Sequence, residues 1–282
     1  MQVHDPRPCR LGEGPFWHPL RGQLYWFDIP AGRMLTRGVA GPAAWDFHEP
    51  VSAAGWIDRD RVLVAAASGL FRFDLVSGRK DRLCGLGPQG TRSNDGRADP
   101  FGGFWIGTMG IGAERGQGAI WRYHGGRLRR LFDGLTIPNA ICFTPDGREA
   151  RFADTPTRQV MRVALDPEGW PLGAPSVFLD LRSEGLNPDG AVIDAEGVMW
   201  LALWGAGQVA AYGPDGRHLR AVPVPAPQAT CPAFGGENGR GLFVTSALEG
   251  MDAEARARHR LAGMTFRLDD AGPGVPAPRV EI

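Results

Sequence analysis

The sequence predicts an all-β fold, a six-bladed β-propeller in which each blade holds four antiparallel strands around a central channel. One observation is a unit that recurs along the chain: a polar segment, a strand, a tight turn and a second strand rich in bulky residues. In its clearest copy, residues 92–95 precede the turn at 99–103 and the strand that starts at Phe104. The other observation is spacing, because equivalent positions in six copies lie 41 to 50 residues apart, which is typical of propeller blades.

Each copy is expected to supply its strands in the same order. We call the polar or small residue near the start of the first strand the head, and the six heads are Glu13, Ala54, Asp95, Asn139, Asp189 and Ala233. A turn follows each first strand, and the expected second strands are 24–29, 61–66, 104–106, 150–154, 198–202 and 241–245. Third strands are expected at 33–36, 70–74, 119–123 and 263–268. The copies leave no spare segment, which predicts a single domain over 1–282.

Two segments lie outside the repeat. Residues 2–4 precede the first unit, and we expect them to close the ring by pairing as the outer strand of the last blade. Residues 249–261 are rich in Ala, Arg and Glu and predict a helical excursion on the surface. The alternative fold is an ordinary β-sandwich with accidental similarity between its strands, since strand–turn–strand spacing recurs in many all-β proteins.

Composition excludes several classes of protein. The 31 basic and 31 acidic residues give a formal net charge of zero, which argues against a nucleic-acid partner. The N-terminus has no apolar signal-peptide core, and no run of about 18 apolar residues predicts a membrane span. The four cysteines form no C-x-x-C pair, so free thiols in a reducing cytoplasm are expected. We expect a cytoplasmic enzyme that is a monomer or a weak homo-oligomer.

The polar heads predict a site. Equivalent ends of the inner strands of a propeller converge on one mouth of its channel. The polar side chains at these ends are Glu13, Asn94, Asp95, Asn139 and Asp189, with Arg92 nearby. Two carboxylates and an amide oxygen at one mouth suit a divalent cation, either Ca²⁺, Mg²⁺ or Mn²⁺, with Zn²⁺ as a further candidate.

The heads also have a structural interpretation. Asp95 and Asp189 each precede a glycine and would serve as turn formers. Asn139 follows Pro138 and would cap a loop. Glu13 lies between two glycines, where a carboxylate has no evident structural role. Glu13 therefore favours the metal-site interpretation most directly.

At these positions the chain resembles the regucalcin–gluconolactonase family. The motifs that carry the resemblance are Leu-Gly-Glu-Gly-Pro-Phe-Trp at 11–17, Arg-Ser-Asn-Asp-Gly at 92–96, Gly-Thr-Met at 107–109, Pro-Asn at 138–139 and Pro-Asp-Gly at 188–190. They cover essentially the whole chain and follow the family's order. Segments 202–205 and 232–236 look most similar to bacterial sugar lactonases such as xylonolactonases and gluconolactonases.

The resemblance implies a propeller that opens aldonolactones to aldonic acids with one divalent metal ion, so the expected partner is a small sugar lactone. Glu13, Asn139 and Asp189 match the family's metal ligands, and Asp189 also matches its proposed general base. Arg92 and Asn94 match residues that contact the substrate. The chain departs from the animal members after Gly-Thr-Met, where it has 110–113 in place of acidic residues and Glu114 only later. That departure concerns sugar specificity.

Two other functions remain open on the sequence. A propeller hydrolase of other esters or phosphotriesters would use the same metal, and only assays across substrates separate it from a lactonase. A non-enzymatic calcium-binding regulator or interaction module would have a vacant channel mouth. Polar heads in several separate units argue against that second alternative.

Overall fold

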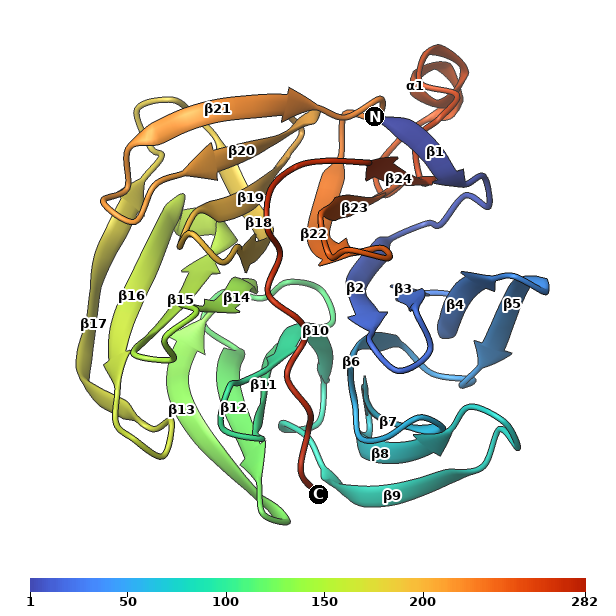
Figure 1. The fold of residues 1–282 in the computed structure, drawn as a ribbon. Coiled ribbons are helices and arrows are strands. Elements are labelled where there is room, and N and C mark those ends of the chain that lie inside the picture. Colours follow the sequence, from blue (N-terminus) through green and yellow to red (C-terminus); the bar gives the residue numbers. More distant parts are fainter.

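The protein forms six four-stranded antiparallel sheets arranged as blades around a central channel, as the computed structural model of residues 1–282 shows (Figure 1). The first two blades contain β2 (Gly12–His18), β3 (Gln23–Asp28), β4 (Arg33–Gly38) and β5 (Gly41–Asp46), then β6 (Val51–Trp56), β7 (Arg61–Ala66), β8 (Gly69–Asp74) and β9 (Lys80–Gly85). The next two contain β10 (Thr91–Ala98), β11 (Phe104–Gly110), β12 (Gly118–His124) and β13 (Arg127–Leu135), then β14 (Pro138–Phe143), β15 (Glu149–Asp154), β16 (Gln159–Leu165) and β17 (Pro171–Asp180). The last two contain β18 (Asn187–Ile193), β19 (Met199–Trp204), β20 (Gln208–Tyr212) and β21 (His218–Pro223), then β22 (Ala229–Gly235), β23 (Gly241–Ser246), β24 (Thr265–Leu268) and β1 (Gln2–Asp5). The predicted six-bladed propeller is confirmed.

Burial falls from the channel outward within a blade. In the third blade every residue of the second strand, β11, is buried, whereas the outer strand β13 has none that is buried. The turn before β11 is closed by Asp99, whose Oδ1 accepts the N–H groups of Phe101 (2.8 Å) and Gly103 (2.9 Å). Its Oδ2 accepts Nε–H of Arg122 at 2.7 Å, and both side chains are fully buried. This ion pair links the turn to the third strand of the blade.

The ring is closed by the N-terminal strand. β1 pairs antiparallel with β24, with Gln2 opposite Arg267 and Val3 opposite Phe266. The expectation that residues 2–4 supply the outer strand of the last blade is therefore confirmed. His4 packs edge-on against Phe243 at a centroid distance of 4.9 Å, and burial lowers the pKa of its imidazole to about 4, so the ring is neutral at pH 7.

Ion pairs fasten β1 to the first blade as well. The buried carboxylate of Asp5 accepts hydrogen bonds from Arg7 Nε at 2.9 Å and Arg37 Nε at 2.7 Å. Arg7 in turn donates to the carbonyl oxygen of Thr36 at 2.7 Å. The N-terminal strand thus contacts both the last and the first blade, which are neighbours only because the ring is closed.

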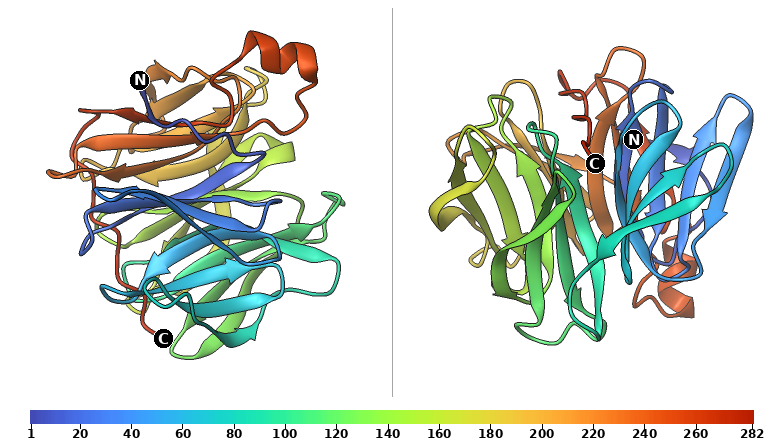
Figure 2. Two further views of the ribbon diagram at one scale, coloured as in Figure 1. Left: turned by 90° about the vertical axis from the view of Figure 1, so that its right-hand side faces the viewer. Right: turned by 90° about the horizontal axis from the view of Figure 1, so that it is seen from below.

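The loop from 247 to 264 and the C-terminal segment from 269 to 282 lie on opposite faces of the ring (Figure 2). The loop carries the one α-helix, α1 (Ala253–Arg258), whose N-cap Asp252 accepts the N–H of Ala255. The predicted helical excursion at 249–261 is confirmed and is shorter than expected. No helix of the structure is long and apolar enough to cross a membrane. All four cysteines are free thiols, as predicted.

Candidate active site

The predicted site residues lie at irregularities in the inner strands. All six inner strands shift register with the second strand of their blade, and in four of them the shift lies at a polar head, between Glu13 and Phe16, Ser93 and Gly96, Asn139 and Cys142, and Pro188 and Ala191. A β-bulge interrupts the alternation of side chains and re-aims one of them. The bulges therefore explain how polar side chains from four blades meet in the channel.

Backbone geometry at Glu13 requires the glycine that follows it. Gly14 has φ of +53°, and a Cβ atom there would lie 2.0 Å from the carbonyl oxygen of Ser52 in the next blade. Only glycine fits this close approach. Its N–H donates to Glu13 Oε2 at 3.0 Å, which fixes the carboxylate. The glycines around Glu13 thus have a structural role in placing this carboxyl group.

The carboxyl groups of Glu13 and Asp189 are both buried and lie close enough to interact electrostatically. Burial, and then the charge of Asp95, raises the pKa of Glu13 to about 8. Burial, and then the charge of Glu13, raises the pKa of Asp189 well above its usual value. Two buried carboxylates that repel each other are stabilised as anions by a cation between them. The arrangement therefore fits a metal ion.

Asn139 is oriented by hydrogen bonds on both ends of its amide. Its Nδ2 donates to Thr155 Oγ1 at 2.9 Å, and the Thr155 hydroxyl donates to the carbonyl oxygen of Pro188 at 2.8 Å. Its Oδ1 accepts from Asn94 Nδ2 at 2.8 Å, which leaves one lone pair of that oxygen for a cation. Together with the two carboxyl groups, Asn139 completes an all-oxygen donor set of the kind that Ca²⁺ and Mg²⁺ prefer.

Arg92 and Asn94 extend this network to the edge of the site. Arg92 Nη1 donates to Asn94 Oδ1 at 2.9 Å, and Asn94 also donates to the carbonyl oxygen of Pro138 at 3.1 Å. Burial lowers the pKa of the half-buried Arg92, and the charges of Glu13 and Glu249 oppose that shift. A chain of hydrogen bonds thus runs from Arg92 through Asn94 and Asn139 to Thr155.

Two acidic residues take other positions. Asp95 Oδ2 accepts the N–H of Ile141 in the neighbouring blade at 2.7 Å, so this head links two inner strands. That role is structural, which agrees better with the structural interpretation of Asp95 than with a role as a metal ligand. Glu114 is exposed, and its Oε2 accepts the N–H of Gly112 within its own loop at 3.1 Å. Its carboxylate turns back on its loop and contacts none of the predicted ligands.

Thr155 is the residue that sequence reasoning missed. It opens the short 3₁₀ helix Thr155–Thr157 after β15, and nothing in a Thr-Pro-Thr turn indicates a part in a site. Its hydroxyl joins the side chain of Asn139 to the carbonyl oxygen of Pro188, the residue before Asp189. Thr155 therefore couples two of the predicted ligands across the boundary between the fourth and fifth blades.

Replacing Thr155 with Val is expected to lower metal affinity about tenfold, the usual cost of losing a group that orients a ligand. The valine keeps the shape of the side chain but frees the amide of Asn139 to rotate. Metal affinity would be measured by competition with a fluorescent chelator. Thr155→Ser should bind metal as the wild type does. Thr157→Val removes a hydroxyl that bonds the carbonyl oxygen of Asp154 and the N–H of Gln159 but none of the predicted ligands, and is the matched control. Equal affinities of Thr155→Val and the control would contradict the role of Thr155.

Comparisons with known proteins identify the family to which the chain belongs. Residues 11–248 match the family model described as SMP-30/Gluconolactonase/LRE-like region. The chain is 35% identical to a pentonolactonase of Haloferax volcanii over 97% of this chain and 96% of that protein. It is 33% identical to a 6-deoxy-6-sulfogluconolactonase of Pseudomonas putida over 96% and 95% of the two chains.

A solved structure extends the likeness to the whole fold. The calcium-binding protein regucalcin from Agrobacterium tumefaciens superposes with a TM-score of 0.97 at 39% identity, covering 100% of this chain and 97% of that one. The predicted resemblance is therefore confirmed. The chain belongs to the SMP-30/gluconolactonase/LRE-like family.

Proposed function

We propose that this protein opens sugar lactones to aldonic acids at the channel mouth, with one divalent cation held by Glu13, Asn139 and Asp189. Relatives named as a pentonolactonase, a 6-deoxy-6-sulfogluconolactonase and an L-arabinolactonase make the chain a lactonase. One observation supports the metal most directly. Two buried carboxyl groups that repel each other lie near Asn139, whose amide is held in place by hydrogen bonds at both ends.

The cation, when bound, would polarise the lactone carbonyl and stabilise the negative charge that develops on its oxygen. Asp189 is the proposed general base, because its carboxylate takes a proton from the attacking water. The bond from water oxygen to the carbonyl carbon forms, the bond to the ring oxygen breaks, and the proton passes to that oxygen as a hydroxyl group. Burial, which raises the pKa of Asp189, makes its carboxylate a stronger base.

Arg92 and Asn94 are the proposed substrate contacts. The guanidinium group of Arg92 and the amide oxygen of Asn94 are joined by a hydrogen bond of 2.9 Å, so the two side chains are held in a fixed arrangement. The N–H groups of Arg92 on Nε and Nη2 would donate to oxygen atoms of the sugar. Asn94, whose two amide hydrogens are donated to Pro138 and Asn139, would accept from a sugar hydroxyl group through its oxygen. Asn94 also donates a hydrogen bond to Asn139, so it would couple the position of the substrate to the position of this metal-ligating side chain.

Among the candidate cations we favour Ca²⁺, because the donor set is made of oxygen atoms and the solved relative is described as a calcium-binding protein. Mn²⁺, Mg²⁺ and Zn²⁺ are the alternatives. We further propose that the enzyme works in the cytoplasm, where its four free thiols stay reduced.

The test is to remove metal with a chelator and restore cations one at a time, with a panel of five- and six-carbon aldonolactones as substrates. Acid release should fall to the spontaneous rate without metal and return with one or more cations. A phosphotriester and an aryl ester serve as control substrates and should react far more slowly. A chelated enzyme that keeps full activity would refute the metal. Faster turnover of the phosphotriester than of every lactone would refute the substrate class.

A further inference from the structure

The C-terminal segment covers the channel on the face opposite the candidate active site. We call residues 275–278 the strap, and it crosses the centre of the ring from β24 toward the second and third blades (Figure 1). Before the strap, the carbonyl oxygen of Pro273 accepts the N–H of Ala195 at 2.8 Å. After it, the N–H of Val280 donates to the carbonyl oxygen of Trp56 at 2.8 Å. The strap itself is held by one hydrogen bond, from Trp56 Nε1 to the carbonyl oxygen of Ala277 at 2.7 Å.

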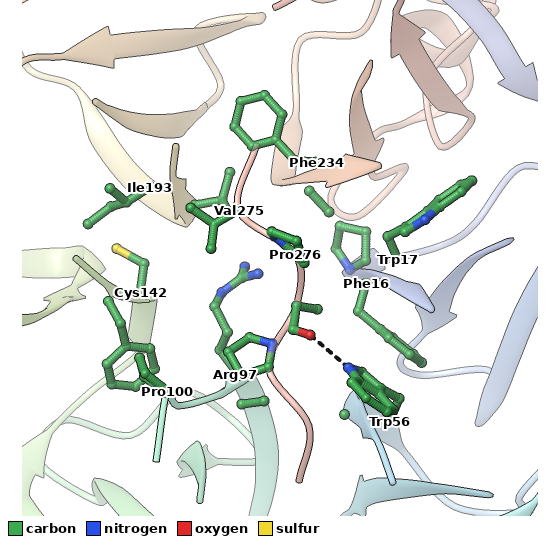
Figure 3. Close-up of a pocket in the computed structure, with 18 of the residues that line it drawn as sticks. Phe16, Trp17, Trp56, Arg97, Pro100, Cys142, Ile193, Phe234, Val275 and Pro276 are labelled. Atoms are coloured by element: carbon green, nitrogen blue, oxygen red, sulfur yellow. Dashed lines mark hydrogen bonds between the residues drawn. The ribbon is translucent and has the colours of Figure 1, made fainter. Parts of the chain in front are cut away.

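A cavity of about 130 Å³ lies beneath the strap. Figure 3 shows its lining, in which side chains from inner strands of several blades, among them Trp17, Trp56, Ile193 and Phe234, surround the strap. An apolar cavity of about 150 Å³ can hold a benzene molecule. The cavity therefore has room for a ligand of about one aromatic ring.

Arg97 is the one charged residue among those that line this cavity. Its Nε donates to the carbonyl oxygen of Ile141 at 2.9 Å and its Nη2 to that of Ala191 at 2.8 Å, while Nη1 donates no hydrogen bond within the chain. Nη2 also donates to Cys231 Sγ at 3.7 Å, all three acceptors are neutral, and Arg97 forms no ion pair with a carboxylate. Asp95, on the same strand, accepts the N–H of Ile141 and forms no ion pair with Arg97, although the charge of Arg97 partly offsets the rise in the pKa of Asp95 that burial causes. An apolar enclosure with one unpaired cation is complementary to an anion that has an apolar body.

We propose that this cavity is a second binding site, for a small aromatic monocarboxylate of the size of benzoate. The ring packs among the aromatic side chains, and the carboxylate accepts hydrogen bonds from Nη1 of Arg97. The strap forms one wall of the cavity, and its single side-chain hydrogen bond permits it to move as the ligand enters. A sugar lactone or aldonic acid does not fit the chemistry, because its hydroxyl groups would find Thr144 as the only hydroxyl partner in the lining.

Isothermal titration calorimetry of the full-length protein tests the proposal, with benzoate, benzyl alcohol and acetate as probes. Benzoate should bind saturably and about tenfold more tightly than benzyl alcohol, which has the ring without the charge. Acetate, which has the charge without the ring, should give no saturable heat. Failure of benzoate to bind the wild type would overturn the proposal, and so would equal affinity for benzoate and benzyl alcohol.

Two variants locate the site. Val275→Phe fills the cavity from the strap and should abolish binding of both aromatic probes, whereas Val76→Phe, the same change at an exposed position, should leave it unaltered. Arg97→Met should remove the preference for benzoate and keep the binding of benzyl alcohol. If Arg97→Met does not fold, the binding of benzoate to Val275→Phe tests the location of the site. Wild-type affinity of Val275→Phe for benzoate, or loss of that affinity in Asn94→Ala, would place the ligand elsewhere and refute the proposal.

Discussion

Asp189→Asn is expected to lose about a thousandfold in kcat, and excess metal should not restore it. The asparagine keeps the size of the side chain and one oxygen for the cation, but it cannot take a proton from water at neutral pH. Loss of a general base typically costs between about a hundredfold and ten-thousandfold. Activity would be followed as acid release from an aldonolactone while metal is titrated to saturation.

Glu13→Gln is the matched variant, because it removes the same charge from the other carboxyl group of the pair. It should bind metal more weakly, since a carboxylate ligand attracts the cation as well as orienting it. High metal concentration should then recover much of its activity. Equal recovery of the two variants would leave Asp189 as a ligand only. Full activity of Asp189→Asn without added metal would refute the whole metal-lactonase proposal.

Deletion of residues 1–8 is expected to lower the melting temperature by on the order of 10 °C. The deletion removes β1, uncovers the edge of β24 and exposes Phe243, against which His4 packs. It also removes the carboxylate of Asp5 and leaves the partly exposed Arg37 without its ion-pair partner, so together with the lost strand pairing a loss of about 3 kcal/mol is expected. In a protein of this size each kcal/mol shifts the melting temperature by about 2–4 °C.

Differential scanning calorimetry would measure this change. The control is Gln2→Ala, because the side chain of Gln2 is exposed and bonds only the exposed Asp269. That variant should melt within about 1 °C of the wild type, as surface substitutions usually do. A deletion variant that melts like the control would show that the last blade does not depend on β1.

The blades could be predicted from the sequence because each inner strand repeats a local pattern. A polar or small head, a bulky strand and a turn such as that at Asp99 are all encoded within about 20 residues, so their recurrence is visible without a structure. The closure of the ring could also be predicted, because the six copies of the unit left only residues 2–4 to complete the last blade. The ligand roles of Glu13, Asn139 and Asp189 stay predictions.

The features that could not be predicted from the sequence depend on contacts between blades. Thr155 lies in the turn after β15 of the fourth blade, and its hydroxyl bonds Pro188 of the fifth blade. No local sequence pattern predicts a contact between two blades. The position of the strap could not be predicted for a similar reason. Its Val-Pro-Ala-Pro sequence has no periodicity, and its position follows from anchors at Ala195 and Trp56 in different blades.

The pairing of β1 with β24 has a consequence for biosynthesis. Among the strands of the propeller, β1 is made first and pairs with β24, which is made last, so the ring cannot close until β24 has been synthesised. Until then the nascent chain carries an unpaired N-terminal strand and an open last blade, whose edges can pair with other chains. We therefore expect nascent chains truncated before Thr265 to be recognised by chaperones and proteases as unfinished, even though five blades are already encoded.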